Sequence, residues 1–224
     1  MNENALNKNK LISNVIRKIN NNLKLIIILL SSCFTIFLFI QLFGFYTSSK
    51  IKKNSIDFFS SQNFEDQTLL EKSIIKLSEE NDFYGFLSKL ELIEIYIKDE
   101  NYDFAINLYN ELLKDNNLDS IYQSAIASKA AYQFIDINLT DFSKNYSETI
   151  KSFINFIDDE LNNFQGAKLE LNYLLKILDL EKNNNEYTNF HEAIDLYNNI
   201  MSSDSASSII KERVKKIHEF YSYK

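Results

Sequence analysis

Residues 101–112 read NYDFAINLYNEL, and residues 189–200, which begin 88 positions later, read NFHEAIDLYNNI. In register, the two stretches share an initial Asn, an aromatic residue, an Ala-Ile pair, a Leu-Tyr-Asn run and a final aliphatic residue. Residues 145–156 lie midway, read NYSETIKSFINF, and keep the Asn, the aromatic residue and three apolar positions. Three copies in one register, at a spacing of 44 residues, indicate an internal repeat.

Each copy has the pattern of an amphipathic helix. In the first copy, Ala105, Leu108, Tyr109 and Leu112 are spaced i, i+3, i+4, i+7 and therefore share one helical face. The small side chain of Ala105 lets a neighbouring helix approach closely. The initial Asn of each copy is expected to be the helix N-cap, because its side-chain oxygen can accept a hydrogen bond from a backbone N–H group.

A second amphipathic segment precedes each copy. These segments occupy residues 84–98, 120–137 and 167–180. The mostly polar links between helices are expected at residues 115–118, 138–144 and 182–188. The apolar stripe of residues 120–137 is the weakest of the three and is expected to consist of Ile121, Ala125, Ala131 and Phe134. Each pair of segments predicts a helical hairpin.

Further helices are expected at residues 65–79 and 205–221. We therefore predict that residues 65–224 form an all-α stack of helical hairpins, an α-solenoid. The alternative is an ordinary helical bundle in which two helices are similar by chance. Because the register holds at both 44 and 88 residues, the pattern favours the solenoid.

The composition excludes several other classes of protein. The chain of 224 residues has three glycines, no proline, one cysteine and two histidines. Sheet folds need many tight turns, which use Gly and Pro, and phosphate-binding loops need clustered glycines. One cysteine cannot form an internal disulfide or a Cys-based zinc cluster. Helices joined by turns of Asn, Asp and Ser are the remaining interpretation.

Residues 25–46 read LIIILLSSCFTIFLFIQLFGFY and contain no charged side chain. As a helix, this stretch has a length of roughly 33 Å, enough to cross a hydrocarbon core of about 30 Å. We therefore predict a transmembrane helix over residues 25–46 that contacts the lipid bilayer. Residues 47–64 are expected to form a helical extension or linker between this helix and the repeat domain.

The flanking charges predict the orientation in the membrane. Five basic residues precede the apolar stretch (Lys8, Lys10, Arg17, Lys18 and Lys24) and three follow it closely (Lys50, Lys52 and Lys53). This difference favours a cytoplasmic leader at residues 1–24 and an exported remainder. The leader has a net charge of +4, which leaves −11 for residues 47–224, since the whole chain carries −7. An acidic domain argues against binding of nucleic acid and of anionic lipid surfaces.

Two alternatives to a membrane anchor exist for the apolar stretch, a cleaved signal peptide and a lipoprotein signal. The apolar region of a cleaved signal peptide is typically about 7–15 residues long. This stretch is longer, so an uncleaved anchor is favoured. The sequence Leu30-Ser31-Ser32-Cys33 resembles a bacterial lipobox, but the residues after Cys33 stay almost wholly apolar. A mature lipoprotein does not normally begin with such a run.

The first hairpin resembles a tetratricopeptide repeat (TPR). Leu92, Tyr96, Ala105 and Tyr109 match the spacing of that family's apolar consensus, and residues 100–103 look like its turn between two helices. The chain departs from the family because the proline after the second helix is absent and the spacing is 44 residues instead of about 34. The resemblance implies a degenerate, TPR-like array.

The order of the segments narrows the resemblance. A basic leader, one uncharged span ending in aromatic residues, a helix leaving the membrane and TPR-like hairpins resemble the ancillary SecYEG translocon subunit family of bacterial inner membranes. This resemblance covers nearly the whole chain and rests on architecture. It implies a single-pass inner-membrane protein with a cytoplasmic N-terminus and a periplasmic domain. Its implied partners are Sec translocon components, periplasmic chaperones or exported clients.

No catalytic, cofactor-binding or metal-binding residue is predicted. His191 precedes Glu192, but the second histidine of a zinc-protease helix is missing, and His191 is expected on a surface. His218 is expected to be solvated. Asp158, Asp159 and Glu160 are expected to form a solvated acidic face in the C-terminal half of a helix. We therefore predict a protein that is not an enzyme and has no cofactor and no small-molecule substrate.

Some TPR proteins bind the terminal carboxylate of a chaperone through Lys and Asn side chains. The corresponding positions of the first hairpin hold Leu90 and Glu94, which cannot bind an anion. The function predicted is a membrane-anchored scaffold that binds partner proteins near the translocon. The alternatives are a TPR-like organiser of the cell envelope or of division, and a TPR receptor of reversed topology that is anchored to an organelle and faces the cytosol.

Overall fold

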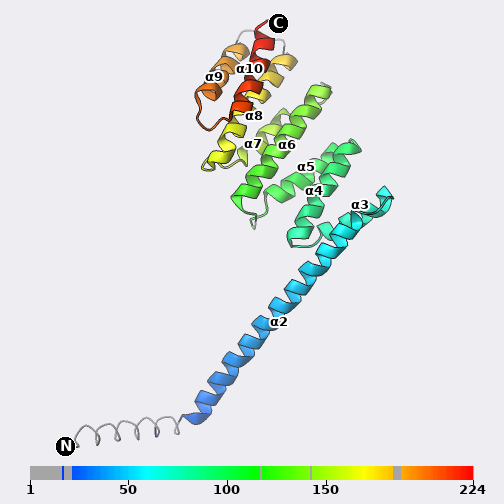
Figure 1. Cartoon of the computed structure of the whole chain (residues 1–224), viewed down its shortest axis with the longest axis vertical. Helices are drawn as coiled ribbons and strands as arrows, with labels where there is room; N and C mark the ends of the chain where they lie inside the picture. Colours follow the sequence, from blue (N-terminus) through cyan, green and yellow to red (C-terminus); the bar gives the residue numbers. More distant parts are fainter. Residues whose placement is uncertain (1–16, 18–21, 117, 142, 184–187, 224) are drawn as a thin grey trace, which may run out of the picture.

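The structure is a computed structural model that describes residues 17, 22–116, 118–141, 143–183 and 188–223. Every regular element within these ranges is an α-helix, so the predicted all-α class is confirmed. The helices are α2 (Leu23–Ser61), α3 (Gln67–Ser78), α4 (Phe83–Lys98), α5 (Tyr102–Leu113), α6 (Ser120–Thr140), α7 (Ser147–Asn155), α8 (Asn162–Asn183), α9 (Thr188–Ser202) and α10 (Ser208–Ser222). Figure 1 shows a long helix, α2, that carries a stack of shorter helices at its C-terminal end.

The predicted hairpins are confirmed. Helix α4 packs against α5, α6 against α7, and α8 against α9, while α10 covers the end of the stack against α8 and α9. Consecutive hairpins are joined through contacts of α5 with α6 and of α6 with α8. At the other end, α3 folds back between α2 and α4 (Figure 1). Each hairpin therefore buries an apolar face that it cannot cover alone, as in other repeat arrays.

Aromatic residues at equivalent positions of the first two copies contact one another edge to face. The rings of Tyr102 and Tyr146, which are 44 positions apart, have centroids 6.0 Å apart. The rings of Tyr109 and Phe153, also 44 positions apart, are separated by 5.5 Å. Phe134 of α6 contacts both Tyr146 and Phe153, at 5.1 and 5.8 Å. Such contacts are expected when similar hairpins stack in register, and chance similarity in a bundle does not predict them.

Helix α6 differs from its predicted stripe. Ala131 and Phe134 are buried as expected, but Ile121 and Ala125 are exposed. The buried side chains of α6 instead include Ile126, Ala127 and Ile135, because α6 contacts α5 and α7 as well as α8. A helix that is covered on several sides has apolar residues on more than one face. Its sequence therefore lacks the single apolar stripe that predicts one buried face.

The predicted Asn N-caps are confirmed only in position, and only in the first copy. Asn101 is the N-cap residue of α5, but its side chain makes no capping hydrogen bond. Instead, α4 ends in a Schellman motif: Glu100 has a φ of 57°, and the Asn101 N–H group donates to the Tyr96 carbonyl oxygen at 2.7 Å. The backbone of Asn101 therefore closes α4 while α5 begins at the next residue.

In the second copy, Asn145 lies one residue before the N-cap, Tyr146, and accepts a hydrogen bond from the Ser147 N–H group at 3.3 Å. The Asn189 side chain, in the third copy, lies outside the described residues. The side chains that cap helices in the structure belong to Asp66, Asp82, Asp119 and Ser207. Each of these four capping residues has an extended backbone, as is typical of an N-cap.

Two glycines allow the backbone of one element to approach another closely. A Cβ atom added to Gly85 would lie 1.9 Å from the carbonyl oxygen of Glu80, at the entrance of α4. A Cβ atom added to Gly166 of α8 would lie 2.5 Å from the carbonyl oxygen of Ser205, between α9 and α10. Gly44, in the apolar half of α2, has no such neighbour within 4 Å.

We expect Gly85→Ala to destabilise the fold although Ala favours helices by about 1 kcal/mol over Gly. The added methyl group meets a backbone atom that cannot rotate away, and overpacking of this kind costs about 1–3 kcal/mol. Urea unfolding of the detergent-solubilised chain, followed by circular dichroism, measures the difference. Gly44→Ala is the matched control and should leave the midpoint unchanged. Equal midpoints for the two variants would contradict the close approach.

A buried ion pair holds the end of the stack together. Glu170 of α8 is completely buried, and its carboxylate accepts hydrogen bonds from the Arg213 guanidinium of α10 and from the Tyr132 hydroxyl of α6, the latter at 2.6 Å. Its hydrogen bond to Glu170 raises the pKa of Arg213. Burial, together with the Glu170 carboxylate, raises the pKa of Tyr132. One carboxylate thus joins three helices.

Removal of the Arg213 charge should leave the Glu170 carboxylate buried without its cation. Because the guanidinium is partly exposed, we expect Arg213→Met to cost about 2–3 kcal/mol, at the lower end of values for buried pairs. The matched control is Lys216→Met, which breaks an exposed pair with Glu212 on the same helix and should cost less than about 0.5 kcal/mol. In the Arg213→Met background, Glu170→Gln should restore part of the loss. Chemical unfolding of the three variants tests this assignment, which fails if the Arg213 and Lys216 variants are equally stable.

Candidate functional site

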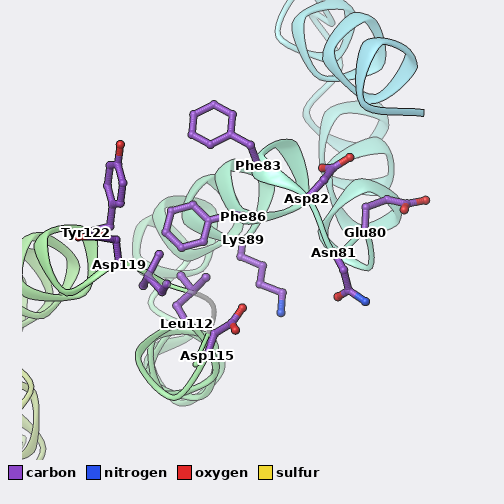
Figure 2. A pocket seen from close by; sticks show the side chains of 11 residues that line it. Glu80, Asn81, Asp82, Phe83, Phe86, Lys89, Leu112, Asp115, Asp119 and Tyr122 are labelled. Atoms are coloured by element: carbon purple, nitrogen blue, oxygen red, sulfur yellow. The ribbon is translucent and has the colours of Figure 1, made fainter. Parts of the chain in front are cut away.

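An open groove of about 570 Å³ lies where α4, α5 and α6 meet (Figure 2). It is formed by the start of α4, the end of α5 with the following loop, and the start of α6. Its lining residues are Glu80, Asn81, Asp82, Phe83, Phe86, Lys89, Leu112, Asp115, Leu118, Asp119 and Tyr122. We call this site the aromatic–acidic groove.

The apolar part of the groove consists of three aromatic rings above a buried leucine. Phe83 and Tyr122 are 59% and 58% exposed, whereas Phe86 is half-buried and Leu112 is buried. Figure 2 shows Phe83 and Phe86 of α4 across the groove from Tyr122 of α6. Large aromatic side chains contribute strongly to binding energy when a partner covers them, and a cluster of them around one hollow is the usual form of such a site.

The polar part of the groove is negatively charged. Glu80, Asp82, Asp115 and Asp119 line it, against one cation among the described lining residues, Lys89, whose ammonium group pairs with Glu111 of α5 at 3.0 Å. Asp82 and Asp119 also cap α4 and α6 by accepting hydrogen bonds from backbone N–H groups. The positive end of a helix dipole is equivalent to only about half an elementary charge, so the two helix ends offset part of the charge of these carboxylates and an excess of negative charge remains.

Helix α2 holds one wall of the groove. The buried Asn54 side chain of α2 donates a hydrogen bond to Oδ2 of Asp82 at 2.7 Å, while Oδ1 of Asp82 accepts from the N–H groups of Tyr84 and Gly85 at 3.0 Å. Lys50 of α2 pairs with Glu80 at 2.5 Å, and this contact raises the pKa of Lys50. The groove is therefore fixed to the helix that carries the apolar stretch.

The position of these contacts along α2 determines where the groove lies. Asn54 follows Tyr46, the last residue of the apolar stretch, by eight residues of continuous helix. At 1.5 Å per residue, this places the groove wall about 12 Å beyond the end of the stretch. Figure 1 shows that the loops before α4, α6, α8 and α10 all lie on the edge of the array that faces the apolar half of α2.

That edge is acidic. Its described loop residues include the acids Glu79, Glu80, Asp82, Asp115, Asp119, Asp158, Asp159, Glu160 and Asp204, against the single base Lys114. Much of the −11 net charge of residues 47–224 is thus gathered on one edge of the array, and the groove opens within it.

The two histidines lie on different helices, α9 and α10, at the end of the array. His191 is exposed on α9, and its neighbour Glu192 pairs with Lys176 of α8. His218 was expected to be solvated, but it is half-buried and its ring stacks on Tyr197 with centroids 4.0 Å apart. Burial lowers the pKa of His218. His218 is therefore half-buried because it packs on Tyr197. Tyr197 occupies the repeat position of Tyr109 and Phe153, and it packs against α10 instead of a further hairpin.

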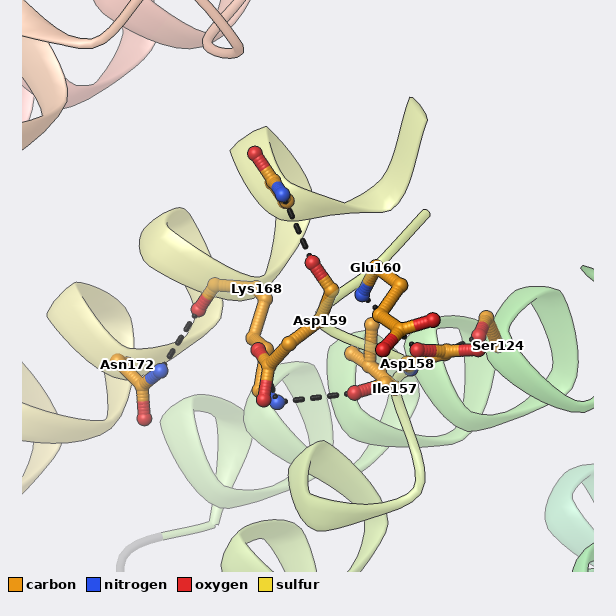
Figure 3. A network of polar contacts seen from close by, with 8 residues as sticks. Ser124, Ile157, Asp158, Asp159, Glu160, Lys168 and Asn172 are labelled. Carbon is orange, nitrogen blue, oxygen red and sulfur yellow. Dashed lines mark hydrogen bonds and ion pairs between the residues drawn. The ribbon is translucent and has the colours of Figure 1, made fainter. Parts of the chain in front are cut away.

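The acidic residues Asp158, Asp159 and Glu160 were expected within a helix, but they form the link between α7 and α8 (Figure 3). Oδ1 of Asp158 accepts a hydrogen bond from the Glu160 N–H group at 2.9 Å, and such local bonds compete with helix formation. Asp159 pairs with Lys168 of α8 at 2.7 Å. The Asp158 N–H group donates to Oγ of the buried Ser124 of α6 at 3.0 Å, which anchors the link.

Leu90 and Glu94, which stand where some TPR proteins bind a carboxylate, make contacts within the array. The Glu94 carboxylate accepts from Gln133 at 3.0 Å and pairs with Lys129 at 2.7 Å, so it joins α4 to α6. Leu90 packs against the main core. Within the described residues, no group of three or more His, Cys, Asp or Glu side chains is arranged to hold a metal ion.

Sequence reasoning did not identify the groove, because its residues come from three helices and two loops. The sequence does contain a local signal: Asp82-Phe83 and Asp119-Ser120-Ile121-Tyr122 place large apolar residues directly after a capping Asp. Such residues precede the buried part of their helices and tend to remain exposed.

Comparison of the chain with protein-family models, with curated proteins and with solved structures gave no match.

We expect Asp82→Ala to destabilise the chain more than Asp119→Ala, although each substitution removes one N-cap. Loss of a cap costs about 1 kcal/mol. Asp82→Ala also leaves the buried Asn54 amide without its acceptor, which adds about 1–3 kcal/mol. The difference is measured by urea unfolding, and Asp82→Ala combined with Asn54→Leu should recover part of it. If the two single variants unfold together, Asp82 acts only as a cap.

Proposed function

We propose that this protein is a membrane-anchored, TPR-like scaffold that binds partner proteins at the exported face of a bacterial inner membrane. It would assist the Sec translocon and envelope chaperones there. The observation that carries this proposal is α2, which joins an apolar stretch long enough to cross a membrane to the helical array without a break.

The exposure of the apolar stretch supports the anchor. All described side chains between residues 25 and 46 are exposed, most of them are apolar and none is charged. Each Leu, Ile or Phe side chain left in water forgoes about 1.5–3 kcal/mol relative to an apolar environment. A helix with this surface is stable in lipid, where its backbone hydrogen bonds are satisfied internally.

The charge distribution supports the orientation. Five basic residues precede the apolar stretch, three follow it within the first turns of the extension, and residues 47–224 carry −11. Basic residues are retained on the cytoplasmic side more readily than on the exported side. In this orientation the helical array and its acidic edge stand outside the cytoplasm.

The mechanism proposed is an increase in effective concentration. One anchor confines the array to the membrane surface, so that a partner in the same membrane meets it without diffusing through the whole compartment. The firm connection of α2 to Asp82 holds the array close to the bilayer, as a flexible linker would not. No bond is made or broken in this role.

Two measurements test the proposal. An export-dependent reporter fused after Lys224 should be active and a cytosol-only reporter inactive; the opposite result would support a cytosolic receptor instead.

In vivo crosslinking at native expression, followed by purification, should recover SecY or export chaperones. Replacement of residues 25–46 by an unrelated apolar span should preserve this recovery, because the mechanism needs only confinement to the membrane. Absence of SecY and of chaperones, with localisation to division sites, would favour an envelope organiser.

A further inference from the structure

The aromatic–acidic groove has an apolar surface that the chain itself does not cover. Phe83 and Tyr122 stand on two helices and are both more than half exposed, with Phe86 between them. Single exposed apolar residues are normal on protein surfaces, but three aromatic rings around one hollow are not. The volume of about 570 Å³ lies within the range of sites that hold a drug-sized ligand, which corresponds to a few side chains of a peptide.

The negative charge of the groove favours a positively charged ligand. Four carboxylates line the groove, those of Glu80, Asp82, Asp115 and Asp119. Glu80 is paired with Lys50, and Lys89, the one cation among the described lining residues, is paired with Glu111. An anionic segment would meet this charge at close range, whereas a Lys or Arg side chain would be attracted to it. A second copy of the acidic domain is an unfavourable occupant, since both copies carry −11 over residues 47–224.

The place of the groove selects the source of the ligand. It opens on the edge of the array that faces the apolar half of α2, and one of its walls is bonded to Asn54 of that helix (Figure 1). A segment that approaches along the membrane surface reaches this edge first.

We propose that the aromatic–acidic groove docks a short segment of a partner protein in which an aromatic or large aliphatic side chain is flanked by Lys or Arg. The inference rests on the proposed scaffold function, because it specifies the chemistry of the partner. The apolar side chain inserts between Phe83 and Tyr122 above Leu112. The flanking cations lie against Asp115 and Asp119 at the rim.

The test uses the full chain in nanodiscs of zwitterionic lipid and labelled peptides of twelve residues that repeat Lys-Phe-Lys-Leu. Fluorescence anisotropy, corrected for binding to empty nanodiscs, measures Kd. A peptide with Glu in place of Lys, and one with Ser in place of Phe and Leu, should each bind at least tenfold more weakly. Equal binding of the Glu peptide would overturn the proposal.

Substitutions locate the binding. Phe83→Ala with Tyr122→Ala should raise Kd at least tenfold, whereas Phe220→Ala with Ile209→Ala, at exposed positions of α10, should not change it. Asp115→Asn with Asp119→Asn should raise Kd about three- to tenfold and weaken its dependence on salt. Asn retains the capping ability of residue 119, and Asp99→Asn with Asp103→Asn, near the opposite edge, is the matched control. Circular dichroism checks that each variant is folded.

Peptide binding that survives the Phe83 and Tyr122 substitutions would show that the groove is not the site. Native mass spectrometry tests whether the groove instead holds a second copy of the chain. If the Phe83 and Tyr122 substitutions dissociate an oligomer, a second copy occupies the groove and the proposal is wrong. Peptide binding in the groove without recovery of Sec components in cells would contradict the scaffold function but not the docking inference.

The opposite outcome is recovery of those components by the Phe83 and Tyr122 variant when the native chain binds no peptide. That outcome would contradict the docking inference but not the scaffold function.

Discussion

The Asp82 carboxylate joins the two parts of this molecule. One of its oxygens caps α4 and the other accepts a hydrogen bond from the buried Asn54 of α2. Since α2 is one continuous helix from the apolar stretch to Ser61, every hairpin is positioned relative to that stretch through this contact and the apolar packing beside it. A change in the angle of α2 would therefore move the whole array. Residues 47–64, expected as a helical extension or linker, include the end of α2, where Asn54, Phe58 and Ser61 are buried.

The array is held differently at its two ends and in its middle. Near α2, the ties are Asn54 with Asp82 and Lys50 with Glu80. In the middle, aromatic rings at equivalent repeat positions pack edge to face, so that the packing of one hairpin supports the next. At the far end, no further hairpin follows among the described residues, and α10 covers the last pair through the buried Glu170 carboxylate and the stacked His218 ring. A terminal helix with many charged residues on its outer face is a suitable end for such an array.

Much of the fold could be predicted from the sequence because the signals are periodic. The spacing of Ala105, Leu108, Tyr109 and Leu112 predicts a helical face, and the structure buries Ala105, Tyr109 and Leu112. The structure differs from the prediction where a residue contacts two elements at once. Asn101 stands at the N-cap of α5 as expected, but its backbone closes α4 and its side chain makes no capping hydrogen bond. Asp158 was expected in a helix, but its carboxylate bonds to the backbone of its own turn, and Ser124 holds that turn in place.

The sequence alone is enough to predict the all-α class, the hairpin boundaries to within a few residues, the apolar stretch and the charge of each segment. These properties depend on residues close together in the chain, where periodicity and composition are sufficient. Tertiary structure alone decided which acidic residues gather on one edge, that Glu170 meets Arg213, and that Phe83, Phe86 and Tyr122 surround one groove. Those arrangements depend on the angles at which successive hairpins pack. Such angles depend on contacts between residues far apart in the chain, such as the close approach of the Gly166 backbone to Ser205, which no local pattern in the sequence reveals.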